Sequence, residues 1–161
     1  MFKFFALVAF LICSAITLTA PAQAQTQARF SILEDGKEVF DKQTGLKWQR
    51  CTMGQDWDGK TCFGSPITKT FDVLQSSLKP KPNAADAKWR LPTEKELASL
   101  IDKQFKSPTI DPVAFPNTPL GYFWTSTPYS GNTELIRYVY FTDGFIYHGL
   151  KTDFLYTRLV K

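Results

Sequence analysis

The amino-acid sequence predicts an α+β domain, in which two helices are segregated from antiparallel strands. Short runs rich in aromatic and β-branched residues occur between residues 29 and 48 and again after residue 121. Aromatic residues make up 15% of the 161 residues, which favours short strands with aromatic packing over long helices. The two segments with helical spacing lie between these two strand regions.

The first 24 residues have the features of a secretory signal peptide. Lys3 supplies a positive charge, Phe4–Leu18 is apolar, and Ala22–Ala24 has the small-x-small pattern of a cleavage site. We therefore expect a signal peptide over residues 1–24 and a single domain over residues 25–161, in the periplasm or outside the cell. An uncleaved membrane anchor is the alternative, but the apolar stretch is short for a bilayer.

Composition and charge exclude several classes of function. Without residues 1–24 the chain keeps 18 basic and 15 acidic residues, which are interspersed, so we expect no nucleic-acid partner. A single histidine, His148, excludes a histidine-based metal cluster within one chain. The sequence contains no nucleophile elbow, phosphate loop or dinucleotide fingerprint. We therefore expect no catalytic residue, no metal and no cofactor.

Two cysteines remain after the signal peptide, Cys51 and Cys62, and export favours a disulfide between them. The alternative is a reactive thiol, but neither cysteine has a neighbouring base. The loop between them contains Asp56-Trp57-Asp58-Gly59, which is similar to part of a calcium loop. The other ligand positions are missing, which favours a plain Asp-Gly turn.

The N-terminal strands are predicted from turn signals. Arg29–Leu33 is expected to form a first strand, followed by a turn over residues 34–36. Residues 39–41 and 46–48 flank a segment that ends in Gly45, which predicts a hairpin with a positive φ at this glycine.

Two helices are predicted in the middle of the chain. The first covers Thr70–Leu78 by its apolar spacing, and a solvated loop over residues 79–83 ends it. The second is predicted over Glu94–Lys103, because Thr93 and Glu96 have the spacing of a capping box.

The remainder of the chain is predicted as a loop followed by strands. Four prolines between Ser107 and Pro119 predict a long ordered loop, with Ile110, Val113 and Phe115 as apolar anchors. Four strands should follow, the second and third joined by the two-residue turn Asp143-Gly144. They are expected at Tyr122–Ser126, Leu135–Thr142, Phe145–Leu150 and Phe154–Lys161. We expect the last strand to pair with the first.

Six motifs in this order resemble the Lcl C-terminal domain family, also called DUF1566, over about residues 39–161. They are Asp41-x-x-Thr44-Gly45-Leu46-x-Trp48, Trp89-Arg90-Leu91-Pro92-Thr93-x-x-Glu96-Leu97, Ile110-Asp111-x-x-x-Phe115-Pro116-Asn117-Thr118, Phe123-Trp124-Thr125-Ser126-x-Pro128-Tyr129, Tyr138-x-x-Phe141-x-Asp143-Gly144 and Arg158-Leu159-Val160.

This resemblance implies a C-type-lectin-like fold, with two helices packed on an antiparallel sheet and a long ordered loop region. The family's namesake is the C-terminal domain of a trimeric collagen-like adhesin that binds sulfated glycans, although this chain has no Gly-x-y stalk. The resemblance also implies a distant kinship with formylglycine-generating enzymes. These enzymes need a pair of cysteines in their C-terminal half, and no cysteine follows Cys62 here.

The residues of these motifs have structural interpretations. Trp48, Trp89 and Trp124 are expected in the core. Arg90 is expected to pair with a carboxylate or with carbonyls beside the second helix, and Glu96 to cap that helix rather than act in catalysis.

We expect a non-enzymatic bacterial binding or structural module. Its partner would be a sulfated or anionic glycan, or another surface protein. The candidate ligand residues are Arg137, Tyr138, Tyr140 and His148, which join basic and aromatic groups in two neighbouring predicted strands. As a lone histidine, His148 is otherwise expected to be half-exposed on the surface.

Overall fold

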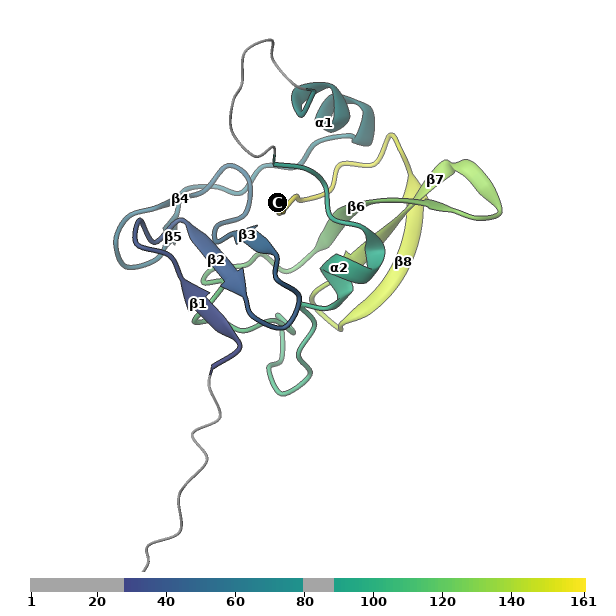
Figure 1. The fold of residues 1–161 in the computed structure, drawn as a ribbon. Coiled ribbons are helices and arrows are strands. Elements are labelled where there is room, and N and C mark those ends of the chain that lie inside the picture. The colour runs from purple at the N-terminus through teal and green to yellow at the C-terminus, as the bar shows by residue number, and fades with distance from the viewer. Residues whose placement is uncertain (1–27, 80–88) are drawn as a thin grey trace, which may run out of the picture.

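The computed structural model describes residues 28–79 and 89–161. The predicted signal peptide and the loop after Lys79 lie outside the described residues. The described chain forms three small antiparallel sheets and two short helices (Figure 1). In chain order the elements are β1 (Phe30–Ile32), β2 (Glu38–Asp41), β3 (Lys47–Gln49), β4 (Asp56–Trp57), β5 (Cys62–Phe63), α1 (Phe71–Ser77), α2 (Glu94–Ala98), β6 (Tyr122–Tyr129), β7 (Asn132–Tyr140) and β8 (Phe145–Leu150).

The α+β class is confirmed, but the strands form three sheets rather than one. Their orders are β1-β2-β3, β4-β5 and β6-β7-β8. No helix in the described parts of the chain is long and apolar enough to cross a membrane.

The N-terminal hairpin is confirmed, and Asp41 explains its Asp-x-x-Thr-Gly motif. Gly45 has φ +74° in the turn between β2 and β3. The fully buried carboxylate of Asp41 accepts hydrogen bonds from Arg29, from the Thr44 hydroxyl and from the Gln43 N–H. Burial alone would raise the pKa of Asp41, but these hydrogen bonds outweigh it and lower the pKa below its usual value.

The second helix is shorter than predicted, although its capping box is confirmed. The Thr93 hydroxyl accepts from the Glu96 N–H, and the Glu96 carboxylate accepts from the Thr93 N–H. The helix ends at Ala98 instead of Lys103. Beyond it the backbone tightens into i→i−3 hydrogen bonds, and the N–H of Asp102 bonds to the Thr109 carbonyl in the long loop.

The long loop is ordered as predicted, but Val113 is not one of its anchors. Ile110 and Phe115 are buried, whereas Val113 is 74% exposed. Ala114 is buried in its place. The loop is held by Arg50, which donates to the carbonyl oxygens of both Val113 and Ala114.

The turn between β7 and β8 has four residues, not the two predicted. Tyr140 is paired with Phe145, so residues 141–144 form the loop. Phe141 turns into the core, where its carbonyl accepts from Thr109. Gly144, with φ +73°, closes the loop.

The predicted final strand is replaced by single bridges to several partners. Lys161 and Leu159 bond to β3, Val160 also bonds to Arg90, and Leu155 bonds to Lys69. The last segment therefore pairs with β3 and not with the first strand, which pairs with β2. A segment that lies between separate sheets cannot pair with any one of them along its whole length.

Two apolar clusters form the core. The first lies between the N-terminal sheet, the long loop and β6–β7, and includes Trp48. The second lies under α1 and includes Trp124, whose ring meets Phe71 edge-on at 5.5 Å. Trp48 and Trp124 are fully buried, as expected, whereas Trp89 is only partly buried.

Candidate functional site

The four predicted ligand residues do not share one surface. Arg137 lies opposite His148 in the β7–β8 ladder, and Tyr138 lies opposite Tyr147. Successive side chains of a strand point to opposite faces of the sheet. The pair Arg137 and His148 is therefore on one face, and Tyr138 and Tyr140 are on the other. This corrects the prediction of a single cluster.

The side chain of Arg137 contacts an aromatic ring and a carboxylate. The His148 ring stacks on Tyr129 with centroids 4.2 Å apart. The guanidinium of Arg137 lies 5.1 Å from the Tyr129 ring centre, and its Nε is 3.5 Å from Glu94 on α2. Glu94 therefore offsets part of the positive charge that an anionic ligand would need. His148 is exposed, further out than the half-exposed position predicted for it.

The opposite face carries a cluster of four tyrosines, which we call the tyrosine face: Tyr122, Tyr138, Tyr140 and Tyr147. Tyr122 stacks on Tyr140 with centroids 4.2 Å apart and meets Tyr138 edge-on at 4.9 Å. Tyr147 lies 6.2 Å from both Tyr138 and Tyr140. Tyr122 and Tyr147 are 40% and 41% exposed, so the rings form a platform open to solvent.

Sequence reasoning found only half of this face. Tyr138 and Tyr140 were predicted, but Tyr122 and Tyr147 were missed. The observed register places Tyr122 opposite Tyr140 and Tyr147 opposite Tyr138, and it depends on a four-residue turn that the sequence did not predict.

Two carboxylates border the tyrosine face. The Tyr147 hydroxyl donates to Asp143 Oδ2 at 2.9 Å, and this bond raises the pKa of Tyr147. The pKa of Tyr138 is also raised, first by burial and then by Tyr122 and Asp153. Both hydroxyls therefore keep their protons at neutral pH and can donate or accept hydrogen bonds.

Gly149 allows Asp153 to approach this face. A Cβ at Gly149 would lie 2.5 Å from Asp153 Oδ2 and 2.8 Å from the Tyr138 ring. Any larger residue would push the carboxylate and the ring apart. The glycine thus brings an acceptor to the rim of the aromatic platform.

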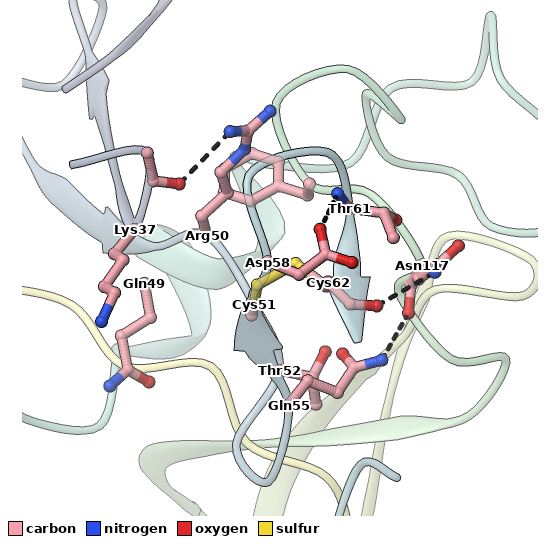
Figure 2. Close-up of a disulfide and its surroundings, with 12 residues drawn as sticks. Lys37, Gln49, Arg50, Cys51, Thr52, Gln55, Asp58, Thr61, Cys62 and Asn117 are labelled. Atoms are coloured by element: carbon pink, nitrogen blue, oxygen red, sulfur yellow. Dashed lines mark hydrogen bonds between the residues drawn. A yellow bond between two sulfur atoms is a disulfide. The ribbon is translucent and has the colours of Figure 1, made fainter. Parts of the chain in front are cut away.

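A concave surface lies beside the disulfide. Cys51 and Cys62 are bonded, with their Cα atoms 5.4 Å apart, and the bond joins β5 to the segment after β3 (Figure 2). The adjacent cleft has a volume of about 310 Å³. It is lined by Asp35, Lys37, Glu38, Gln49, Cys51, Thr52, Met53, Gly54, Gln55, Asp56, Trp57 and Trp89.

The walls of this cleft are held by internal contacts. The Arg50 guanidinium stacks 3.7 Å from the Trp57 ring centre, and Lys161 bonds to Glu38 while lying 4.4 Å from the Trp89 ring centre. Asp58 accepts from the N–H group of Thr61 (Figure 2) and from that of Lys60, which makes the Asp-Gly segment a turn. Within residues 28–79 and 89–161, no group of three or more potential ligands is placed to hold a metal.

Buried Arg158 binds the residues that flank Cys51 and a residue of the long loop, Thr118. It donates to the carbonyls of Gln49 and Arg50 and to the hydroxyls of Thr52 and Thr118. Burial lowers its pKa to about 9, so the guanidinium is still charged at neutral pH. Arg158 is thus a structural residue, inaccessible to any ligand.

The comparisons with known proteins agree with these motifs. The family model of the Lcl C-terminal domain matches residues 37–161. No curated protein matches the chain, and no solved structure matches it. The matched region includes β2 and continues to the last residue, so it contains the tyrosine face and every residue of the cleft except Asp35. This chain belongs to the Lcl C-terminal domain family.

Proposed function

We propose that this protein is an exported, non-enzymatic binding module that takes up glycans on its tyrosine face. The observation that carries the proposal is the solvent-open platform of Tyr122, Tyr138, Tyr140 and Tyr147. Aromatic rings offer a flat apolar surface together with a polar hydroxyl. A sugar ring has the matching property, with an apolar face of C–H groups and hydroxyls around its edge.

The polar groups around the platform favour a neutral glycan. Asp143 and Asp153 accept hydrogen bonds but repel anions, and sugar hydroxyls are suitable donors. One cation near this face is Lys103, whose Nζ lies 4.3 Å from the ring centre of Phe145, the residue paired with Tyr140. A sulfated glycan would instead suit the opposite face, at Arg137 and His148. There, Glu94 already pairs with the Arg137 guanidinium and would compete with a sulfate for it.

Several observations support an exported protein without catalytic activity. The disulfide is typical of an oxidising compartment, in agreement with the predicted signal peptide. Within the described chain Cys51 and Cys62 are bonded to each other, and both precede the C-terminal half. The formylglycine-generating alternative requires its cysteines in that half. We also infer the C-type-lectin-like architecture that the family resemblance implies.

The test is a glycan-array screen of protein purified from a bacterial periplasm, followed by calorimetry on each ligand found. Tyr147→Ala should weaken binding of a neutral glycan at least tenfold. The matched control is Tyr129→Ala, which removes a tyrosine of the same sheet on the opposite face. Equal loss in both variants, or no loss in Tyr147→Ala, would refute the tyrosine face as the binding surface.

The array also tests the anionic alternative. Heparin binding that weakens with salt and is lost in Arg137→Ala would place the ligand on the opposite face and overturn the proposal. Binding of neutral glycans that is insensitive to salt would support it.

A further inference from the structure

The cleft beside the disulfide has two aromatic walls, Trp57 and Trp89, which come from segments far apart in the sequence. Both side chains are half-buried, so part of each indole is packed on the protein and part is open. The cleft volume of about 310 Å³ is at the lower end of the range of small-molecule sites, which is about 300 to 1,000 Å³. The cleft therefore has the size and the apolar surfaces to hold a small ligand.

Trp57 is held in a fixed position by its neighbours. The Arg50 guanidinium stacks on its ring, and Arg50 is itself buried and donates to three backbone carbonyls. The edge of the indole lies against Gly36, where a Cβ would be 2.3 Å from Trp57 Nε1. This wall of the cleft is therefore formed before a ligand arrives, and little conformational freedom is lost on binding.

Two cations behind the aromatic walls disfavour a cationic ligand. Arg50 lies against the Trp57 ring, and the Lys161 Nζ lies 4.4 Å from the Trp89 ring centre. Neither Arg50 nor Lys161 lines the cleft, so both act from behind its walls. A positive group that stacked on either indole from the cleft would be repelled by the like charge across the ring.

The charged groups that line the cleft disfavour an anionic ligand. Asp35, Glu38 and Asp56 supply three carboxylates, against the one ammonium group of Lys37. Lys161 bonds to Glu38 at 2.7 Å and neutralises that carboxylate, which still leaves two carboxylates for one ammonium group. With cations and anions both disfavoured, the cleft is best suited to a neutral ligand.

The polar groups of the cleft offer both donors and acceptors. The exposed Asp56 carboxylate is an acceptor, and the Lys37 ammonium group is a donor. The Gln49 and Gln55 amides can do both. Figure 2 shows the Lys37 and Gln49 side chains extending in the same direction. Hydroxyl groups also donate and accept, so such a set suits a ligand with several hydroxyls.

We propose that this cleft binds a small neutral saccharide, with the apolar face of a sugar ring packed on the indoles and its hydroxyls bonded to Asp56 and Gln49. The site is separate from the tyrosine face, because Figure 1 shows β4–β5 and the sheet β6-β7-β8 on opposite sides of the molecule. With both sites, one chain would link two glycans. That consequence rests on the proposed function, whereas binding in the cleft does not.

Acrylamide quenching of tryptophan fluorescence tests the cleft on its own. Of the four tryptophans, Trp48 and Trp124 are fully buried, so the quencher reaches Trp57 and Trp89. The tyrosine face contains no tryptophan. The probes are glucose, galactose, N-acetylglucosamine, cellobiose and lactose, at least one of which should protect the fluorescence saturably. Choline and sulfate, as cationic and anionic probes, should give no protection. Protection by neither sugars nor ions would overturn the proposal, as would protection by choline or sulfate.

A matched pair of aspartate variants tests the hydrogen bonding. Asp56→Ala should raise the sugar concentration for half-maximal protection about tenfold, as expected for the loss of one hydrogen bond to a charged group. The control is Asp72→Ala, which removes an exposed aspartate of α1 outside the cleft. Both side chains are exposed, so both variants should fold, and their melting temperatures check this. Wild-type affinity in Asp56→Ala, or an equal loss in Asp72→Ala, would overturn the site.

The inference and the proposed function fail separately. Protection of the tryptophans, with no effect of Tyr147→Ala on glycan-array binding, would support the cleft and overturn the proposed function alone. Array binding that requires Tyr147, with no tryptophan protection by any sugar, would overturn the cleft site alone.

Discussion

Arg90 donates two hydrogen bonds to the Glu96 carboxylate, at 2.8 and 2.7 Å, and the same carboxylate accepts the Thr93 N–H at 2.7 Å. The Glu96 side chain thus takes part in both an ion pair and a capping box. The hydrogen bonds from Arg90, acting against burial, lower the pKa of Glu96 to about 2. This arrangement explains why Arg90 and Glu96 occur together in one motif, and it gives both residues structural roles, as predicted.

The low pKa of Glu96 predicts a contribution to acid stability. Its usual value is 4.5, so the charged form is favoured in the folded protein. The stabilisation is complete above about pH 5 and is lost as the pH falls toward 2. Urea denaturation at a series of pH values should give a steeper loss of stability for wild type than for Glu96→Gln. Asp41 is present in both proteins, so its effect on the pH dependence of stability is the same in each. Parallel curves of stability against pH would contradict the prediction.

The Thr93 cap should be worth about 1 kcal/mol of stability. Thr93→Ala removes the hydroxyl that accepts from the Glu96 N–H, and should cost roughly 0.5–2 kcal/mol in chemical denaturation. Thr93→Ser keeps the hydroxyl and should cost much less. If both variants lose the same stability, packing of the Thr93 methyl group is responsible instead.

The disulfide should stabilise the fold by roughly 3 kcal/mol, because it restricts the unfolded chain. Thiol titration of folded, non-reduced protein from the periplasm should detect no free thiol. The double variant Cys51→Ser with Cys62→Ser should have a lower melting temperature and should behave like the reduced wild type. Two titratable thiols in folded, non-reduced protein would refute the bond.

Arg158 should be among the most sensitive positions of the chain. Arg158→Met removes the donor for two carbonyls and two hydroxyls that are buried around it, and should cost at least about 3 kcal/mol. Lysine lacks the planar fork and should not restore stability. The control is Arg137→Met, a half-buried arginine with one long ion pair, for which a loss within about 1 kcal/mol is expected. Similar losses at both positions would contradict the assigned role.

Gly149→Ala should disturb the tyrosine face without unfolding the domain. The new methyl group would overlap Asp153 and the Tyr138 ring, which must then separate. We expect a changed near-ultraviolet circular dichroism spectrum and at least tenfold weaker glycan binding, with the far-ultraviolet spectrum preserved. Unchanged affinity would show that Asp153 takes no part in binding.

The parts of the fold that depend on neighbouring residues could be predicted from the sequence. The capping box at Thr93, the hairpin with Gly45 and the Cys51–Cys62 bond were predicted and are present. Each depends on backbone geometry or chain separation within a dozen residues. The end of the second helix was predicted too late in the chain, because the Asp102 N–H bonds to the Thr109 carbonyl in the long loop. The apolar spacing of the helix residues carries no information on where that loop lies.

Contacts between distant segments decided the rest. The last segment was predicted as one strand, but it bonds to Lys47, Arg90 and Lys69 in turn, and such partners are visible only once the sheets have packed. The four predicted ligand residues are divided between two faces for the same reason. A strand alternates its side chains between two faces, so neighbours in sequence such as Arg137 and Tyr138 are separated by the sheet. Only the pairing of three strands brings Tyr122 and Tyr147 beside Tyr138, and the tertiary structure thereby determined which residues form the candidate site.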